Sequence, residues 1–420
     1  MRDILPPASG VWNEVEAVTR RIFARFNYRE IRTPVLEETA LFARSVGEET
    51  DIVSKEMYTF EDRDGSSVTL RPENTASVLR AYIEHRLDQQ PGLQKLYYMG
   101  PMFRRERPQK GRFRQFYQIG AEAIGSDSPA VDAEVIEMVV TILRELDIRG
   151  FELLINSVGS KESRMRFNEA LRIELKEVAP LMCQDCRRRA EINPLRVLDC
   201  KVPQDQPIID KLPSILDYLD EADAEHFRRV REYLDDRKIG YTVKPRLVRG
   251  LDYYARTTFE ITHGALGAQN AILGGGRYDG LAESLGSKVS APGIGFSIGE
   301  DRLVMTVEEG KTIEPSALDL YMAPMDEGAL RHCAILAADI RKLDLSVEVG
   351  TERKLKRMME LANKLAAGCV LIVGENEISA GSYTLKEMAS GQQQTLSRDE
   401  LLRRLSDSRK HGGSEVGPNG

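Results

Sequence analysis

The sequence predicts an α+β protein with two folded units: a large unit on an antiparallel sheet that carries a helical insertion, then a small α/β domain. Three observations predict this fold class. Residues 55–71 and 97–122 have hairpin patterns, residues 160–238 have a mainly helical pattern, and strands alternate with helices from residue 317. A chain of 420 residues is also too long for one ordinary hydrophobic core.

The expected domain boundaries follow these changes of pattern. The first unit occupies residues 1–315, with the helical insertion at about 160–238, and the second unit occupies residues 316–406. Residues 407–420 end in the Gly-rich sequence HGGSEVGPNG, which predicts a disordered tail.

The first unit begins with apolar residues at helical spacing, which predict an amphipathic helix over residues 9–27. The segment IRTPVLEE predicts a short strand with Pro34 at an edge or an interface, because proline donates no ladder hydrogen bond. Residues 55–71 predict a hairpin that turns at Asp64-Gly65. The later elements expected before the insertion are a helix from near Pro72, a helix over residues 130–146 and the strand FELLINSV.

The second unit has the order strand LDLYMA, helix 326–342, strand LSVEV, helix 353–366 and strand CVLIVG. This alternation predicts a small parallel α/β domain, which two short strands and a helix close near Ser406.

The most basic stretch of the chain is the predicted hairpin YYMGPMFRRERPQKGRFRQFYQIGAE, residues 97–122. Six cations and one acid lie between Arg104 and Arg114, interleaved with aromatic residues, and Pro-Gln-Lys-Gly forms the expected turn. Such a hairpin offers fixed guanidinium groups to phosphate oxygens and a flat ring to a purine. On charge alone, a solvated basic loop is the simpler interpretation.

Bulk composition narrows the class of protein. The net charge of −7 argues against non-specific nucleic-acid binding over the whole surface. No apolar run has the length of a membrane span, and MRDILPPASG at the N-terminus lacks a signal-peptide core. We therefore expect a cytoplasmic protein without membrane contact.

The cysteines are five in number, which argues against a disulfide framework. Cys183-x-x-Cys186 followed by Cys200 resembles part of a zinc site, but no fourth ligand stands at a suitable spacing. Reduced thiols are the preferred interpretation, so no metal ligand is assigned, and the metal status of these three cysteines stays open.

The common nucleotide-binding loops are absent from the sequence, which contains neither G-x-x-x-x-G-K-[ST] nor G-x-G-x-x-G after a strand. Gly274-Gly275-Gly276 and Gly293-x-Gly295 match neither pattern, and we interpret them as turns or close-packing glycines. A nucleotide would therefore bind to arginines on an antiparallel sheet.

Four separated blocks resemble the histidyl-tRNA synthetase family of class II aminoacyl-tRNA synthetases. IRTPVLEE resembles motif 1, whose proline lies at the dimer interface, MFRRERPQKGRFRQFYQIGAE resembles motif 2, and GIGFSIGEDRL resembles motif 3. LVRGLDYYARTTFE and LGGGRYDGL resemble the two blocks peculiar to the histidine enzymes. The resemblance extends from residue 1 to about residue 406.

The resemblance implies an ATP-dependent histidine–tRNA ligase that forms histidyl-adenylate, releases pyrophosphate and transfers histidine to the 3′ end of tRNA-His. Its substrates would be L-histidine, ATP with Mg²⁺ and tRNA-His, with no tightly bound organic cofactor. A homodimer and an anticodon-binding role for the second unit are implied by the family alone. The first step needs positive charge around a five-coordinate phosphorus.

The implied catalytic residues are Arg104 and Arg249, which would approach the α-phosphate from two sides. In this family the arginine at Arg249 does work that a metal does in related enzymes. Glu106 would accept a hydrogen bond from the adenine amino group, and Phe116 would stack on the ring. The other members of the implied ATP-binding set are Arg112 and Arg302, which would hold the outer phosphates or the adenine face.

The implied histidine-binding set is Glu73, Asn74, Thr75, Gln118, Glu122, Arg249, Tyr253 and Tyr254. Glu122 and Tyr254 would partner the two imidazole nitrogens, and a site that bonds both nitrogens rejects apolar side chains. Glu73, Thr75 and Gln118 would hold the α-amino group. The sequence departs from its bacterial relatives at Asn74, where glycine is common, and at Glu300-Asp301, where a leucine-glutamate pair is common.

Each assignment has a simpler alternative. Glu73 can be an acid at a helix N-terminus, and Gln118 and Glu122 can be surface residues of a strand. Tyr253-Tyr254 can be a core pair, and Arg249 can be an exposed cation.

For the whole chain, the alternative is a non-catalytic, histidine-sensing paralogue of the type of the ATP phosphoribosyltransferase regulatory subunit. That type usually lacks the C-terminal domain and part of the arginine set. A general RNA-binding protein is a third possibility. The run Arg187-Arg188-Arg189 in the insertion can clasp a tRNA acceptor arm or form a solvated helix face.

Overall fold

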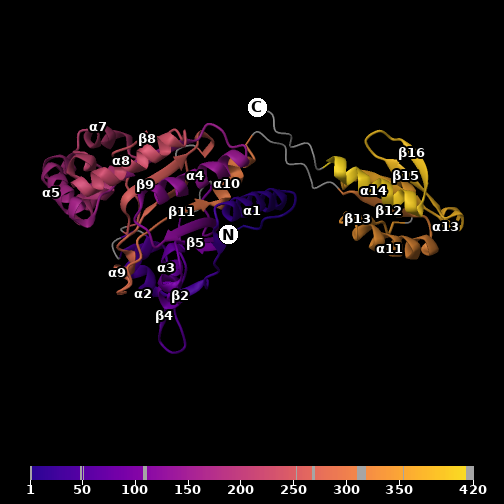
Figure 1. Ribbon diagram of the computed structural model, residues 1–420, viewed down its shortest axis with the longest axis horizontal. Helices are drawn as coiled ribbons and strands as arrows, with labels where there is room; N and C mark the ends of the chain where they lie inside the picture. The colour runs from indigo at the N-terminus through magenta and orange to yellow at the C-terminus, as the bar shows by residue number, and fades with distance from the viewer. Residues whose placement is uncertain are drawn as a thin grey trace. The chain divides into compact units, whose positions relative to one another are not determined.

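The structure, a computed structural model, describes residues 2–47, 50, 52–106, 111–251, 253–266, 270–309, 318–352 and 354–412. The chain forms two compact units, one centred on Val11–Lys311 and the other on Thr312–Gly420 (Figure 1). None of the helices in the described ranges combines the length and the apolar character needed to cross a bilayer.

The larger unit is built on a sheet whose described strands number eight. In spatial order they are β1 (Arg29–Glu30), β5 (Gln94–Phe103), β6 (Gln115–Ile124), β11 (Gly293–Gly299), β10 (Ala271–Arg277), β9 (Ala255–Thr262), β7 (Glu152–Ser157) and β8 (Thr242–Val243). The interior pairs are antiparallel, whereas the edge pairs β1–β5 and β7–β8 are parallel. Strands β5 and β6 form the predicted basic hairpin. Its centre, residues 107–110, lies outside the described residues.

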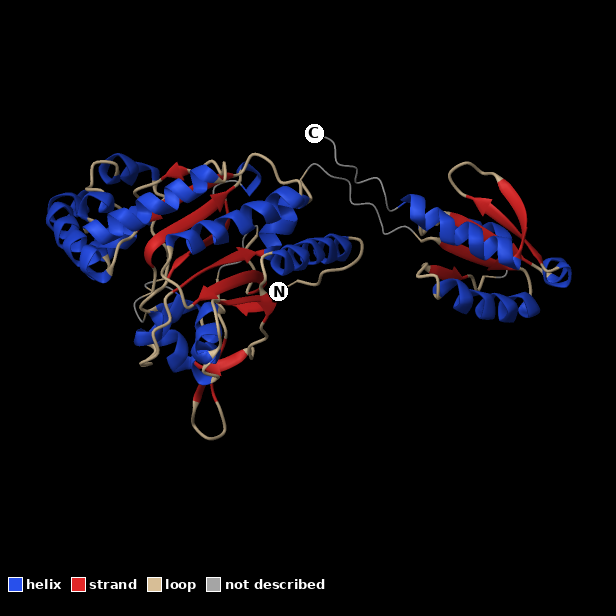
Figure 2. Cartoon of the chain, in the orientation of Figure 1, coloured by secondary structure: helices blue, strands red, loops and turns tan. Residues whose placement is uncertain are grey.

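Helices cover this sheet (Figure 2). They are α1 (Ala8–Arg25), α4 (Pro129–Glu145), α8 (Glu221–Asp236) and α10 (Glu300–Val307). Val135, Ile136 and Val139 of α4 lie in the same core cluster as Val230 and Leu234 of α8, so the two helices share one apolar layer on the strands. The last helix of the predicted insertion therefore belongs to the cover of the sheet.

The rest of the insertion is helical, as predicted. It contains α5 (Lys161–Val178), η3 (Ala179–Leu181), α6 (Gln184–Ile192), η4 (Pro194–Asp199), η5 (Pro203–Asp205), α7 (Gln206–Ile209) and η6 (Ile215–Tyr218). Phe167, Leu171 and Leu175 recur at helical spacing along α5 and are buried in the core cluster that also holds Tyr253 and Tyr254. Its core is therefore continuous with the region of the predicted site.

A second, small sheet in this unit has the order β2 (Leu36–Glu38), β4 (Ser67–Leu70), β3 (Tyr58–Glu61). Strands β3 and β4 are the predicted hairpin, and Gly65 in its turn has a φ of +83°. The strand predicted in IRTPVLEE is confirmed only for its last three residues, which form β2, whereas Thr33 and Pro34 lie between β1 and β2. There the Arg71 side chain bonds the Thr33 carbonyl at 3.0 Å, which replaces ladder bonding.

Shorter helices flank the small sheet and the hairpins. They are α2 (Thr39–Val46), η1 (Ile52–Glu56), α3 (Thr75–Glu84), η2 (Leu87–Gln89), η7 (Gly264–Leu266) and α9 (Leu281–Ser284). Helix α3 begins at Thr75, three residues after the predicted start at Pro72. The carboxylate of Glu73 accepts the backbone N–H groups of Thr75 and Ala76, so it caps the first turn from just outside the helix.

The second unit has a five-stranded sheet in the order β13 (Val347–Val349), β12 (Leu320–Pro324), β14 (Cys369–Val373), β15 (Ser382–Glu387), β16 (Gln393–Ser397). Its helices are α11 (Glu327–Arg341), α12 (Leu355–Lys364), α13 (Glu375–Ala380) and α14 (Arg398–Gly412). The predicted parallel pairing holds for the first three strands, and the last two pair antiparallel. Helix α14 runs past the predicted domain end at Ser406 into the predicted tail, and residues 413–420 lie outside the described residues.

Candidate active site

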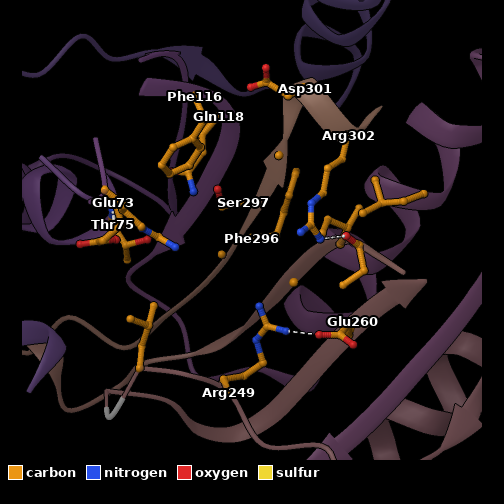
Figure 3. A pocket seen from close by; sticks show the side chains of 18 of the residues that line it. Glu73, Thr75, Phe116, Gln118, Arg249, Glu260, Phe296, Ser297, Asp301 and Arg302 are labelled. Carbon is orange, nitrogen blue, oxygen red and sulfur yellow. Dashed lines mark hydrogen bonds and ion pairs between the residues drawn. The ribbon is translucent and has the colours of Figure 1, made fainter. Parts of the chain in front are cut away.

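The larger unit contains a cavity of about 310 Å³ on the face of its antiparallel sheet. Side chains reach it from β6, β9, β10, β11, the start of α3 and the segment before β9 (Figure 3). Twelve of the residues expected from the sequence line it: Glu73, Thr75, Arg104, Glu106, Arg112, Phe116, Gln118, Glu122, Arg249, Tyr253, Tyr254 and Arg302. Segments that lie well over a hundred residues apart in the sequence therefore line one cavity.

Asn74 is the predicted site residue that does not line the cavity. Its side chain is fully buried, and its Oδ1 accepts hydrogen bonds from Thr33 at 2.6 Å and from Arg71 at 3.3 Å. Asn74 thus ties the segment after β1 to the start of α3. Its side chain therefore points to these two residues and not into the cavity.

Arg249 is held over the sheet by a carboxylate. Its Nη1 donates to Oε2 of Glu260 at 2.6 Å (Figure 3). Glu260 lies on β9, and its partner in register on β10 is Gly274. A Cβ at Gly274 would overlap the guanidinium of Arg249. The glycine therefore leaves the space that the guanidinium fills, and Glu260 fixes its direction. The alternative of a solvent-exposed cation is wrong, since only 21% of the Arg249 side chain is exposed.

Glu122 lies on β6 and is fully buried, with Gly295 of β11 as its partner in register. The Thr75 hydroxyl donates to Oε1 at 2.8 Å. Burial raises the pKa of Glu122 to about 8, although the Thr75 hydrogen bond opposes this shift. A Cβ at Gly295 would overlap the carboxylate. The surface-residue alternative is therefore wrong for Glu122, and also for Gln118, which is 7% exposed.

Glu73 lines the cavity and also caps a helix. Its carboxylate accepts the backbone N–H groups of Thr75 at 2.7 Å and Ala76 at 3.0 Å, at the start of α3. Burial raises the pKa of Glu73, and these two N–H groups oppose that shift. The simpler interpretation, an acid at a helix N-terminus, is thus confirmed without excluding contact with a ligand.

Aromatic rings form a wall of the cavity beside Glu122. The ring centroids of Tyr253 and Tyr254 are 4.7 Å apart, and Tyr278 meets Tyr253 edge-on at 6.1 Å. Tyr253 and Tyr254 are each 8% exposed, so they are core residues and lining residues at once. Their phenols and flat faces suit a small aromatic ligand.

The arginine-rich hairpin supplies another part of the lining. Arg112 donates to Glu106 at 3.0 Å, and Arg104 donates through Nε to the Pro72 carbonyl at 2.9 Å. The Arg104 guanidinium lies 5.2 Å from the centre of the Phe116 ring. These contacts place two cations, a carboxylate and an aromatic face along one edge of the cavity.

Helix α10 brings Arg302 to the cavity, across from Glu73 and Thr75 (Figure 3). Its Nη1 donates to the Ala271 carbonyl at 2.7 Å. The neighbouring Asp301 accepts from the backbone N–H of Tyr117 at 3.0 Å and from Arg2 at 2.8 Å. One Asp301 oxygen thus ties α10 to β6, and the other holds the side chain of Arg2.

A family model described as histidyl-tRNA synthetase matches residues 1–303, and a model described as anticodon binding domain matches residues 319–408. The chain belongs to the histidyl-tRNA synthetase family. The histidine–tRNA ligase of Solibacter usitatus is 69% identical over 96% of this chain and 97% of its own length. The histidine–tRNA ligase of Koribacter versatilis is 55% identical over 99% of this chain and 98% of its own length.

Solved structures agree with this assignment. The apo histidyl-tRNA synthetase of S. aureus has a TM-score of 0.81 and 38% identity, covering 97% of this chain and 98% of its own. The predicted fold class, a class II synthetase domain with an antiparallel sheet and a helical insertion followed by an α/β anticodon-binding domain, is confirmed for this member of the histidyl-tRNA synthetase family.

Sequence reasoning missed several lining residues, chiefly Glu260, Gly274, Tyr278 and Gly295. Glu260 and Tyr278 lie inside the two blocks that carried the family resemblance, so membership in those blocks was the available signal. The sequence predicts that the glycines are turn or close-packing residues. They are strand residues that admit side chains from other elements, so the close-packing interpretation is the right one.

Proposed function

We propose that this chain is a histidine–tRNA ligase. In the first step a carboxylate oxygen of L-histidine attacks the α-phosphorus of ATP, the bond to the β-phosphate oxygen breaks, and pyrophosphate leaves. In the second step a terminal ribose hydroxyl of tRNA-His attacks the acyl carbon of the histidyl-adenylate, and AMP leaves. ATP would arrive with Mg²⁺.

One observation carries this proposal: Arg104 and Arg249, which are remote in the sequence, line the same cavity as Glu122 and Tyr254. Two guanidinium groups beside a buried carboxylate are the arrangement that adenylate formation needs, because charge develops at phosphorus while the amino acid is held alongside. We propose that both arginines contact the α-phosphate, with Glu260 keeping Arg249 in place.

On the nucleotide side, we propose that Glu106 accepts from the adenine amino group and that Phe116 stacks on the ring. Glu106 is already tied to Arg112 at 3.0 Å, which would fix its carboxylate before ATP binds. Arg112 and Arg302 would contact the outer phosphates or the adenine face.

On the histidine side, we propose that Glu122 and Tyr254 partner the two imidazole nitrogens. Gln118 would hold the α-amino group together with Glu73 and Thr75. The Oε1 atom of Gln118 is buried and has no hydrogen-bond partner among the described residues, so it offers a free acceptor. Tyr253 would close the pocket over the ring.

The histidine-sensing alternative is less well supported. Relatives named histidine–tRNA ligase match this chain over nearly its whole length, and the anticodon-binding model matches its second unit. A solved ATP phosphoribosyltransferase regulatory subunit/histidyl-tRNA synthetase from Bacillus halodurans has a TM-score of 0.65, but at 20% identity it shows only the common fold. The full set of predicted arginines in one cavity favours the enzyme.

We further propose that the second unit reads the anticodon and that the chain forms a homodimer. Val35 and Leu36, in the motif 1 segment, are 36% and 52% exposed, and Phe60 of the same small sheet is 48% exposed. Exposed apolar side chains on one small sheet and directly before its strand β2 fit a subunit contact. Light scattering on the protein as it elutes from a size-exclusion column would give its mass, and a monomer at every concentration would contradict the dimer.

The cytoplasmic location stays a prediction.

Exchange of labelled pyrophosphate into ATP tests the function. With each of several amino acids offered singly, we expect exchange with histidine alone, followed by charging of tRNA-His. Histidine binding without exchange by folded protein would support the sensor instead. RNA binding without preference for tRNA-His would support the general RNA-binding protein.

A further inference from the structure

Three of the five cysteines come together in the helical insertion, far in sequence from the lining of the cavity. Cys183 is the N-cap residue of α6, Cys186 lies in its first turn, and Cys200 follows η4. The carboxylate of Asp205, at the end of η5, joins them. One potential ligand atom from each of the four side chains lies within 4.8 Å of all the others.

The spacing of these atoms fits a tetrahedral metal site. The Sγ atoms of Cys183 and Cys200 are 3.9 Å apart. Zinc–sulfur bonds of about 2.3 Å at tetrahedral angles separate two sulfurs by about 3.8 Å. A disulfide would need about 2.05 Å. The Cys200 Sγ lies 3.3 Å from Oδ2 of Asp205. A zinc–oxygen bond of about 2.0 Å would set this sulfur–oxygen separation at about 3.5 Å, so only a small shift is needed to admit the ion.

Backbone groups orient these side chains as they do around structural metals. The N–H of Cys186 donates to Cys183 Sγ at 3.5 Å, and the N–H of Val202 donates to Cys200 Sγ at 3.4 Å. These two bonds hold both sulfurs facing the other members of the cluster. Asp205 is oriented by the backbone N–H of Cys183, at 3.1 and 3.2 Å from its two oxygens. The donor set therefore has its outer support in place.

Burial makes the arrangement hard to explain without a cation. Cys186, Cys200 and Asp205 are all buried, among apolar neighbours that include Val197 and Ile209. Thiols are weak hydrogen-bond donors, so they compensate a buried carboxylate poorly. A divalent ion would neutralise two of the negative charges and bond all four groups at once.

We propose that Cys183, Cys186, Cys200 and Asp205 bind one structural Zn²⁺ ion. Three soft thiolates and one oxygen select zinc over magnesium or calcium, which prefer all-oxygen sites. Four protein ligands close the coordination sphere, so the role is structural and not catalytic. The fourth ligand that the sequence analysis found missing is thus an aspartate, which a search for Cys or His at finger-like spacings passes over.

The zinc ion would stabilise a segment of the insertion that contacts the residue next to Arg249. The ion would tie α6, η4 and η5 together, and Arg196 of η4 lies against Gly250, where a Cβ would be 3.1 Å from its Nη1. Gly250 is the neighbour of Arg249. Loss of zinc is therefore expected to loosen the insertion first and to slow adenylate formation only indirectly.

Metal analysis of the full-length protein, purified without chelator, tests the proposal. We expect about one zinc per chain, falling at least about fivefold in Cys186→Ser and in Asp205→Ala. Cys369→Ser, which removes a thiol from the second unit, is the matched control and should keep its zinc. Co²⁺ in place of zinc should give the absorption of a tetrahedral thiolate site in the wild type and lose it in Cys186→Ser.

Several results would overturn the site. One is wild-type protein that contains no zinc and takes up neither Zn²⁺ nor Co²⁺ after chelation and reduction. Another is a Cys183–Cys200 disulfide in peptides from unreduced protein. If Cys186→Ser fails to fold, titration of the wild-type thiols with a mercurial decides the question, because zinc should leave as three thiols react. Zinc release that does not follow thiol modification would also contradict it.

Discussion

Arg249 and Glu260 form a charge-assisted hydrogen bond of 2.6 Å directly above Gly274, the strand residue paired with Glu260. These three residues depend on one another. The strand register places the carboxylate of Glu260 opposite Gly274, and the guanidinium of Arg249 fills the space that a side chain at Gly274 would occupy. Because a partly buried Arg–Glu bond restricts a long flexible side chain, Arg249 is oriented before substrates bind.

Glu260 is thus predicted to be a positioning residue for adenylate formation. Glu260→Ala should slow pyrophosphate exchange by about 10- to 100-fold, with the affinity for histidine changed by less than about threefold, because Arg249 is proposed to act on the developing charge. Glu260→Gln keeps an acceptor oxygen and should recover part of the rate. Exchange kinetics over a range of histidine concentrations separate kcat from KM. A loss confined to KM would contradict the assignment.

Gly274→Ala is expected to expel the Arg249 side chain from its place, since the added methyl group would overlap the guanidinium. Exchange activity should fall by roughly the same factor as in Arg249→Ala, and combining the two substitutions should add little. Gly240→Ala is the matched control, because a Cβ there would meet nothing within 4 Å. Comparable losses in both glycine variants would argue for a general effect on folding.

The elements of this fold were largely predictable, because strands and helices here follow local patterns. The β3–β4 hairpin, α4 and α11 came from periodicity and turn residues alone. The segment around Pro34 was misassigned because its strand-like composition is overridden by a side chain, Arg71, that bonds its backbone. A tertiary contact of that kind leaves no local trace.

The site was predictable only where residues sit in recognisable blocks. Arg104 and Arg249 were found from their blocks, while Asn74, next to true lining residues, turns inward to Thr33 and Arg71. Asp205 was missed in the insertion because its meeting with three cysteines depends on how short helices fold back on each other. Strand register, which set Gly274 opposite Glu260, is likewise a long-range property.

Arg277 and Asp132 form an ion pair in which neither side chain is exposed, with contacts of 2.8 and 3.0 Å. Asp132 also meets His226 at 2.9 Å. Asp132→Ala would leave Arg277 buried without its main partner, so the free energy of unfolding should fall by about 3–5 kcal/mol. Asp279→Ala removes a partner that is 24% exposed and should cost clearly less. Urea unfolding of both variants measures this, and equal losses would contradict the dominant role of Asp132.

Glu122 is predicted to make the stability of the ligand-free protein depend on pH. Burial raises its pKa from 4.5 to about 8, so the folded state holds this proton more tightly than the unfolded state. The resulting stabilisation is complete below pH 4.5 and is lost as the pH rises through about 8. Glu122→Gln does not titrate, so its stability relative to the wild type should increase between pH 6 and pH 9, by up to about 3 kcal/mol.

Urea unfolding at several pH values measures this difference, and Glu300→Gln is the control. Glu300 is also fully buried, and burial raises its pKa to about 8, but it does not line the cavity. Both variants should therefore gain stability relative to the wild type as the pH rises. Only Glu122→Gln should also weaken histidine binding, and more than it weakens ATP binding, because its carboxylate is the proposed partner of the imidazole. If the free energy of unfolding of Glu122→Gln differs from that of the wild type by the same amount at every pH, Glu122 is not the titrating group. If the variant loses affinity for histidine and for ATP equally, Glu122 does not recognise the imidazole.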